Sequence, residues 1–141
     1  MRCSEIMKSN VSCLMPTDSV RDAAKVMRDL KVGFLPVCDA EKTVLGTITD
    51  RDLAIRILAE GKDPMTEVSD CMSHEVISCS PEDDVKRAQE LMAKNRKSRI
   101  MCLDKNKHLV GVISLSDIAM LSDSAEASKT LRSVAEREVR L

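Results

Sequence analysis

The stretch GTITDRDLA occupies residues 46–54, and a closely similar stretch, GVISLSDIA, occupies residues 111–119. Each begins with glycine and continues through a β-branched run that is typical of a strand. Each then reaches Thr or Ser, followed three residues later by Asp and by apolar residues at helical spacing. The chain therefore contains the same strand-to-helix corner twice, and this repetition indicates how the whole sequence is organised.

The two corners belong to a duplication that spans most of the chain. A single offset of 65 residues, without a gap, brings identical residues into register over a stretch too long for chance. We therefore expect a first copy at residues 1–60, a second at 61–121 and a tail at 122–141. The matched pairs are Met7 and Met72, Val11 and Val76, Pro16 and Pro81, Asp18 and Asp83, Val20 and Val85, Ala23 and Ala88, Met27 and Met92, Asp39 and Asp104, Gly46 and Gly111, Ile48 and Ile113, Asp52 and Asp117, and Ala54 and Ala119.

Each copy has the same order of expected elements. A short apolar strand (11–15 or 76–79) precedes a proline-led turn, whose Ser and acidic residues suit the start of a helix. That helix is followed by two strands joined by a polar turn, which predicts a hairpin, and a second helix begins at the corner. The order is β-α-β-β-α. A unit of this size cannot bury both faces of its sheet alone, so we expect the two sheets to pack together.

Composition argues against several classes of function. The 22 basic residues nearly cancel the 23 acidic ones, so the chain lacks the basic footprint of a protein that binds a phosphate backbone. Phe34 is the single aromatic residue, which argues against stacking on single-stranded nucleic acid. No apolar run approaches 18 residues and the first ten are too polar for a signal peptide, so we expect no membrane span and a cytoplasmic location.

Catalytic and metal-binding patterns are also missing from the sequence. There is no Gly-rich phosphate loop and no nucleophile motif, so we expect that the protein is not an enzyme. The two histidines, His74 and His108, have no ligand spacing, and no metal is predicted. The six cysteines form no CxxC pair and are expected to be free, buried thiols.

The order Pro-x-Asp-x-Val-x-x-Ala, then GFLPVCD, then GTITDRDL resembles the cystathionine-β-synthase (CBS) domain. Two tandem copies resemble a CBS pair, or Bateman module, and the resemblance covers residues 1–121, as in small stand-alone bacterial or archaeal CBS-pair proteins. It implies an α+β fold of two β-α-β-β-α repeats, packed sheet to sheet with pseudo-twofold symmetry.

The same resemblance implies a function. It suggests a non-enzymatic regulatory protein that binds adenosine-containing ligands in the cleft between the repeats and signals to an unknown partner protein. No cofactor is required, and AMP, ADP or ATP is the expected ligand class, ahead of S-adenosylmethionine. A homodimer, a disc of four repeats, is the implied assembly. The alternative is a ligand-free CBS-fold interaction or stress-associated protein.

The corner residues admit two interpretations that are compatible with each other. Thr49 or Ser114 followed by Asp at the third position resembles a helix cap, which stabilises by about 1 kcal/mol and requires no ligand. A helix start also offers free N–H groups to a phosphate. The resemblance implies that Asp52 and Asp117 anchor a ribose, and Thr49 and Ser114 would be the hydroxyls on the phosphate side.

The resemblance also implies an adenine slot along the first strand and the start of the second strand of each copy. Phe34 and Met101 in this set could instead be simple core residues. Beside the phosphate seat, the first copy has Asp50 and Arg51 where the second has Leu115 and Ser116, so we expect the second site to be weaker, altered or empty. The slot residues are Ser12, Cys13, Gly33, Phe34 and Pro36 in the first copy, and Ile77, Ser78, Arg99 and Met101 in the second. The run NRKSR (95–99) could reach a polyphosphate or form a solvated face.

Two further expectations concern the cysteines and the tail. In the fold that the resemblance implies, Cys13 and Cys38 lie on neighbouring strands and could form a redox-sensitive pair, with Cys79 and Cys102 an analogous pair. The tail carries Leu131, Val134 and Ala135 at helical spacing, with Val139 and Leu141 beyond. We expect an amphipathic helix that packs on a partner subunit, or else a frayed terminus.

Overall fold

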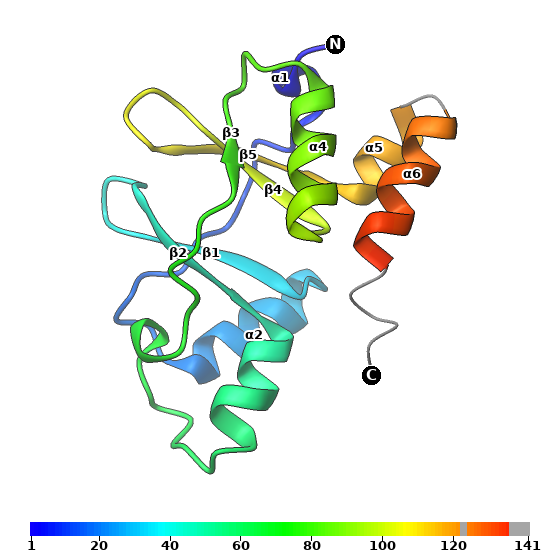
Figure 1. Cartoon of the computed structure of the whole chain (residues 1–141). Coiled ribbons are helices and arrows are strands. Elements are labelled where there is room, and N and C mark those ends of the chain that lie inside the picture. The colour runs from blue at the N-terminus through cyan, green and yellow to red at the C-terminus, as the bar shows by residue number, and fades with distance from the viewer. Residues whose placement is uncertain (122–123, 136–141) are drawn as a thin grey trace. The chain divides into compact units, whose positions relative to one another are not determined.

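A computed structural model describes residues 1–121 and 124–135 (Figure 1). The expected helix, hairpin and second helix occur in both copies, so the α+β class is confirmed. The elements are α1 (Cys3–Ile6), α2 (Val20–Leu30), β1 (Phe34–Cys38), β2 (Val44–Thr49), α3 (Asp50–Asp52), the π-helix η1 (Leu53–Leu58), the 3-10 helix η2 (Val68–Asp70), β3 (Ser78–Cys79), α4 (Val85–Asn95), β4 (Arg99–Leu103), β5 (Leu109–Ser114), α5 (Leu115–Leu121) and α6 (Ser124–Ala135).

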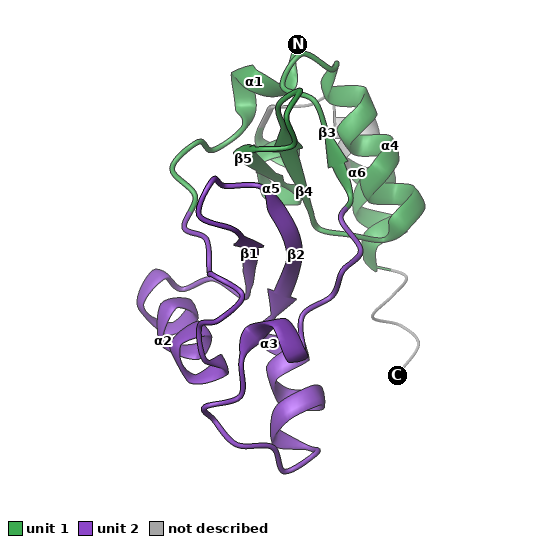
Figure 2. Cartoon of the chain, turned by 90° about the vertical axis from the view of Figure 1, so that its left-hand side faces the viewer, with its two compact units in different colours: residues 1–11, 77–141 green, residues 12–76 purple. Residues whose placement is uncertain are grey.

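Contacts group the chain into two compact units, residues 12–76 and residues 1–11 with 77–141 (Figure 2). The first of these contains the antiparallel β1-β2 sheet, and the second contains the sheet β3-β4-β5, in which β3 runs parallel to β4. The leading segment, 1–11, thus packs with the second copy. The boundaries at residues 60 and 121 are placed from the sequence repeat and stay a prediction, because the two compact units are defined by contacts between residues and not by the repeat.

The predicted first strands are shorter than expected, and the reason differs between the copies. In the second copy β3 keeps two residues, and Met101 N donates to Ile77 O at 3.4 Å. In the first copy only an isolated parallel bridge between Leu14 and Val37 remains. Pro36 stands at the position equivalent to Met101 and has no N–H, so the matching ladder bond cannot form.

The leading segments are exchanged between the copies. Lys8 N donates to Val112 O at 2.9 Å, and Val112 N donates to Lys8 O at 3.0 Å, so the start of the first copy lies along β5. Ser73 forms the equivalent pair of bonds with Thr47 on β2, at 2.8 and 2.9 Å. Each hairpin is therefore bordered by a segment that sequence position assigns to the other copy.

The first helix of each copy follows its predicted pattern. Ser19 caps α2 by accepting from Asp22 N at 3.0 Å, and Asp84 caps α4 by accepting from Lys86 N at 2.9 Å. Both helices end in a left-handed residue at equivalent positions, Lys31 and Arg96. The buried faces are the expected apolar ones: Val20, Ala23 and Met27 on α2, and Val85, Ala88 and Met92 on α4.

The second helix of the first copy departs from the predicted α-helix. After the short α3, residues 53–58 form a π-helix, whereas the second copy has a regular α5. The wider turn keeps Ile57 buried but leaves Leu58 80% exposed, so the apolar stripe predicted for an α-helix is not preserved. Within residues 1–121 and 124–135, no helix combines the length and apolar character needed to cross a bilayer.

The tail forms the predicted helix, but its buried face covers the same chain. Helix α6 packs against α4 and α5, and Val134 belongs to the core of this unit at 4% exposure. The expectation that this face packs on a partner subunit is therefore wrong, because α4 and α5 already supply its apolar contact. Leu131 points elsewhere and is 55% exposed. Val139 and Leu141 lie outside the described residues.

The two corner glycines provide a test of the exchanged segments. A Cβ on Gly46 would collide with the backbone carbonyl of Ser73, whereas a Cβ on Gly111 would meet the flexible Met7 side chain at 2.5 Å. A backbone atom held in a sheet cannot move aside as a methionine can. Gly46→Ala should lower the free energy of unfolding by about 1–3 kcal/mol, and Gly111→Ala by clearly less. Urea unfolding of both variants measures the difference, and equal losses would contradict the exchanged arrangement.

Candidate functional site

The corner of the first copy is a complete capping box. Asp52 N donates to Thr49 Oγ1 at 3.1 Å, and Thr49 N donates to Asp52 Oδ2 at 2.9 Å. These two bonds satisfy backbone groups that the start of α3 would otherwise leave unpaired. The capping interpretation of this corner is therefore confirmed, and the Asp52 carboxylate is held in one orientation with 18% of its side chain exposed.

The other oxygen of the Asp52 carboxylate faces a cation. Asp52 Oδ1 lies 3.7 Å from Arg56 Nε, one turn further along the chain. Arg56 is itself fixed, because its Nη1 donates to Cys71 O at 2.8 Å. A carboxylate has about four acceptor positions, so the cap and this ion pair leave acceptor capacity on Oδ1.

The corner of the second copy reproduces this geometry. Asp117 N donates to Ser114 Oγ at 3.1 Å, and Ser114 N donates to Asp117 Oδ2 at 2.9 Å. The cation differs in origin, since Lys8 Nζ from the exchanged leading segment lies 3.6 Å from Asp117 Oδ1. The Ser114 hydroxyl is also shared with Ser116 Oγ at 2.8 Å, a contact that the first copy cannot make.

Five of the predicted residues of the first copy gather at its corner: Gly33, Phe34, Thr49, Asp50 and Asp52. Phe34 is the register partner of Thr49 across the hairpin, and Asp50 N donates to Gly33 O at 3.0 Å. A Cβ on Gly33 would lie 2.6 Å from Asp50 Oδ2, so the exposed Asp50 side chain would have to move to admit one. Pro36 lies two pairs further along β1 and is buried, while Ser12 and Arg51 are exposed.

The predicted residues of the second copy also lie together, within their own unit. Arg99 is the register partner of Ser114, and Ser78 is the partner of Met101. Met101 is only 2% exposed, which favours core packing for this residue. Ile77 is half-buried and accepts from Met101 N. The assignment of both groups to a ligand stays a prediction.

The cysteine pairs differ in their chemistry. Cys13 is half-buried and Cys38 is buried. The hydrogen bond from Cys38 stabilises the Cys13 thiolate and, with Lys42 nearby, lowers its pKa to about 7 despite partial burial. The same contact and burial raise the pKa of the Cys38 thiol.

Cys79 and Cys102 of the second copy form a buried cluster of three thiols with Cys3 of the leading segment. Cys79 Sγ lies 3.6 Å from Cys102 Sγ and 3.7 Å from Cys3 Sγ. Burial raises the pKa of Cys3 to about 12, and the Cys102 contact and burial raise that of Cys79. The raised pKa values of Cys3 and Cys79 disfavour their thiolates, so the pair of Cys79 and Cys102 is not a chemical equivalent of Cys13 and Cys38. In the part of the chain that the structure describes, no group of three or more His, Cys, Asp or Glu residues could hold a metal ion.

Three side chains at these sites were missed from the sequence: Arg56, Lys8 and Cys3. Arg56 follows Asp52 by four residues, a helical spacing at which opposite charges meet, so its ion pair had a local signal. Lys8 and Cys3 reach the second copy through the exchanged leading segment, across more than 70 residues. No local pattern reports such a contact.

The comparison with known proteins now identifies the class. The family model of the CBS domain matches residues 3–59 and 68–123, and the chain belongs to this family as a tandem pair. The chain is 35% identical over 124 residues to the CBS domain-containing protein YhcV of Bacillus subtilis (strain 168), covering 88% of this chain and 87% of that protein.

Two solved structures share the fold. One is the CBS domain pair of protein MJ0100 in complex with 5-methylthioadenosine and S-adenosyl-L-methionine, with a TM-score of 0.76, 24% identity, and 86% of this chain and 98% of that chain covered. The other is CBSX2 in complex with AMP, with a TM-score of 0.74, 21% identity, and 84% and 93% covered.

The lowered pKa of Cys13 predicts selective alkylation. The thiolate reacts, so the iodoacetamide rate at Cys13 should rise as the pH increases through about 7, while the raised pKa values of Cys3, Cys38 and Cys79 keep those thiols slow. Cys38→Ala removes the donor and raises the pKa of Cys13, so the rate at pH 7 should fall about tenfold. Peptide mass spectrometry measures the rate, with Cys79→Ala as the matched control. An unchanged rate in Cys38→Ala would show that the contact does not tune Cys13.

Proposed function

We propose that this chain is a non-enzymatic, cytoplasmic regulatory protein that binds adenosine-containing ligands of the AMP, ADP or ATP class. The observation that carries the proposal is the repeated corner, where a hydroxyl and an oriented carboxylate meet at the end of a hairpin. A carboxylate accepts hydrogen bonds from the paired hydroxyls of a ribose, and the serine or threonine hydroxyl suits a phosphate oxygen.

Family membership supports this ligand class. MJ0100 and CBSX2 share the fold of this chain, and their structures hold 5-methylthioadenosine with S-adenosyl-L-methionine and AMP, respectively. Each of these ligands combines an adenine with a ribose. In this chain the adenine would lie along the segment from Ser12 to Cys13 and the start of β1, including Gly33, Phe34 and Pro36.

The first copy supplies the stronger site in this proposal. Arg51 is an exposed cation next to the corner, where the second copy has the neutral Ser116. Among the described residues, the Thr49 hydroxyl is engaged by the cap bond from Asp52 N alone, whereas the Ser114 hydroxyl is also engaged by Ser116. The first corner therefore offers a phosphate a freer hydroxyl, with the Arg51 guanidinium beside it. Ligand binding would shift the conformational equilibrium of a homodimer, and a partner protein would respond to the change.

The ligand and its site can be tested together by thermal melting. AMP, ADP, ATP or S-adenosylmethionine should raise the melting temperature of the native protein, because a ligand that binds only the folded state stabilises it. Asp52→Asn should abolish most of this shift. Asp117→Asn should have a smaller effect.

Loss of the cap alone must be separated from loss of the ligand contact. Ser19→Ala removes a cap of similar strength from α2, about 1 kcal/mol, at a position outside the proposed site. This variant should melt lower but keep the full ligand shift. If no adenosine ligand moves the melt of the native protein at millimolar concentration, the proposed function is wrong; if the shift persists in Asp52→Asn, the site is wrong.

The contact between Cys13 and Cys38 favours a second candidate function, sensing of hydroperoxides. The Cys13 thiolate would attack the peroxide oxygen, break the O–O bond and become a sulfenic acid as the alcohol or water leaves. The Cys38 thiol would then attack that sulfur, forming the disulfide and releasing water. The two thiols supply the two electrons that reduce the peroxide. The partial exposure of Cys13 allows the peroxide to reach it.

Hydrogen peroxide should convert Cys13 and Cys38 into a disulfide, detected by non-reducing peptide mapping. Cys38→Ala should instead accumulate a sulfenic acid on Cys13 that dimedone traps. The buried cluster of Cys3, Cys79 and Cys102 is the internal control and should stay reduced, because all three thiols are buried and the raised pKa values of Cys3 and Cys79 disfavour their thiolates. Oxidation of that cluster before Cys13 would contradict this assignment.

A further inference from the structure

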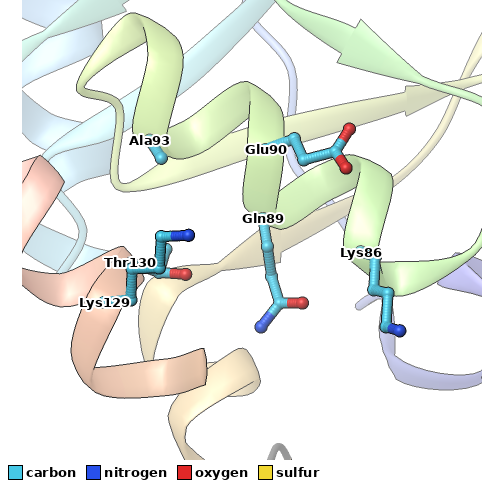
Figure 3. Close-up of a pocket in the computed structure, with 6 residues that line it drawn as sticks. All are labelled: Lys86, Gln89, Glu90, Ala93, Lys129 and Thr130. Carbon is cyan, nitrogen blue, oxygen red and sulfur yellow. The ribbon is translucent and has the colours of Figure 1, made fainter. Parts of the chain in front are cut away.

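A pocket of about 410 Å³ lies between α4 and α6, apart from both corners (Figure 3). Both helices belong to the same compact unit, so the pocket is defined within that unit. None of the residues assigned to the adenosine ligand lines it. The lining residues are Lys86, Gln89, Glu90 and Ala93 from α4, and Lys129 and Thr130 from α6.

The pocket contains a buried amide whose nitrogen has no partner. Gln89 is 7% exposed, and its Nε2 donates no hydrogen bond to the part of the chain that the structure describes. Buried donors are nearly always satisfied, because an unpaired one loses its bonds to water without replacement. Figure 3 shows the Gln89 side chain extending from α4 on the side where α6 lies.

The first copy shows that the fold does not need an amide at this position. The residue equivalent to Gln89 is Ala24 on α2, which is exposed. The second copy therefore has a buried hydrogen-bonding side chain at a position where the first copy has an exposed alanine. An apolar residue would fill the same contact without an unpaired donor.

The charges around the pocket favour an anion. Lys86 lies one turn before Gln89 on α4, and Lys129 lies on α6; neither forms an ion pair within 4 Å with the described acidic residues. Glu90 does not neutralise them, since its Oε2 pairs with Arg87 Nη1 at 3.9 Å. In Figure 3 its carboxylate points away from the amide of Gln89.

We propose that the pocket between α4 and α6 binds a small molecule that carries an oxyanion, a carboxylate or a phosphate. One oxygen of the anion accepts from Gln89 Nε2, and Lys86 and Lys129 balance its charge at the mouth. Ala93 and the aliphatic stems of the lysines border the space left for the rest of the molecule. The pocket volume suits a small metabolite. Because the two walls come from different helices, the ligand ties α6 to α4.

Inorganic phosphate and succinate are the two probes, each compared with sodium chloride at equal ionic strength. At least one should raise the melting temperature above the chloride control and bind in isothermal titration calorimetry. The active probe identifies which oxyanion the pocket prefers. Gln89→Leu should weaken binding about tenfold or more, because it removes the buried donor to the anion. This variant should fold at least as stably as the native protein without ligand.

A double variant, Lys86→Ala with Lys129→Ala, tests the charges at exposed positions where folding is not at risk. It should also weaken binding about tenfold or more, whereas Lys94→Ala, on α4 but outside the pocket, should leave binding unchanged. Asp52→Asn should keep the full response, which separates this site from the proposed adenosine site. If neither probe exceeds the chloride control, or if binding survives in both pocket variants, the proposal is overturned.

Discussion

The backbone pairing between each hairpin and the exchanged leading segment is the constraint on which both corners depend. Ser73 pairs with Thr47 on β2, two residues before Thr49, and Lys8 pairs with Val112 on β5, two residues before Ser114. These bonds form along the strands that end in the corners. A slip of one residue in a strand turns every side chain to the opposite face, so the pairing also fixes the direction in which each corner projects.

Duplication has preserved the backbone of the two copies more strictly than their chemistry. Residues other than glycine adopt the left-handed backbone conformation at equivalent positions of the two copies: Lys31 with Arg96, and Lys42 with Lys107. The chemistry differs at one pair of buried register partners. This pair is Leu14 and Val37 in the first copy, and the equivalent pair in the second copy is Cys79 and Cys102. The reactive cysteine pair of the first copy stands one position away from that ladder pair and has no counterpart. One backbone thus carries two chemically different environments.

Local patterns predicted the helices, the hairpins and the corners, because caps, turn residues and apolar spacing act over a few residues. The offset of 65 residues then predicted that both corners share one geometry, as the paired capping boxes confirm. The exchange of leading segments, the ion pair of Lys8 with Asp117 and the packing of α6 on α4 could not be predicted. They depend on contacts between distant segments, and the residues involved carry no periodic signal. The π-helix at 53–58 follows a sequence that is periodic for an α-helix.

The cap and the proposed ligand contact use the same carboxylate, and this sharing has a physical advantage. Thr49 N holds Asp52 Oδ2, so the orientation of Oδ1 is set before any ligand arrives. A side chain already fixed by the backbone loses little conformational freedom on binding, which removes part of the entropic cost of association. Arg56 pairs with the same carboxylate without sealing it, because their separation of 3.7 Å is an ion pair and not a short hydrogen bond. The cap is therefore the reason that this corner could serve as a binding site, and the two interpretations of the motif describe one arrangement.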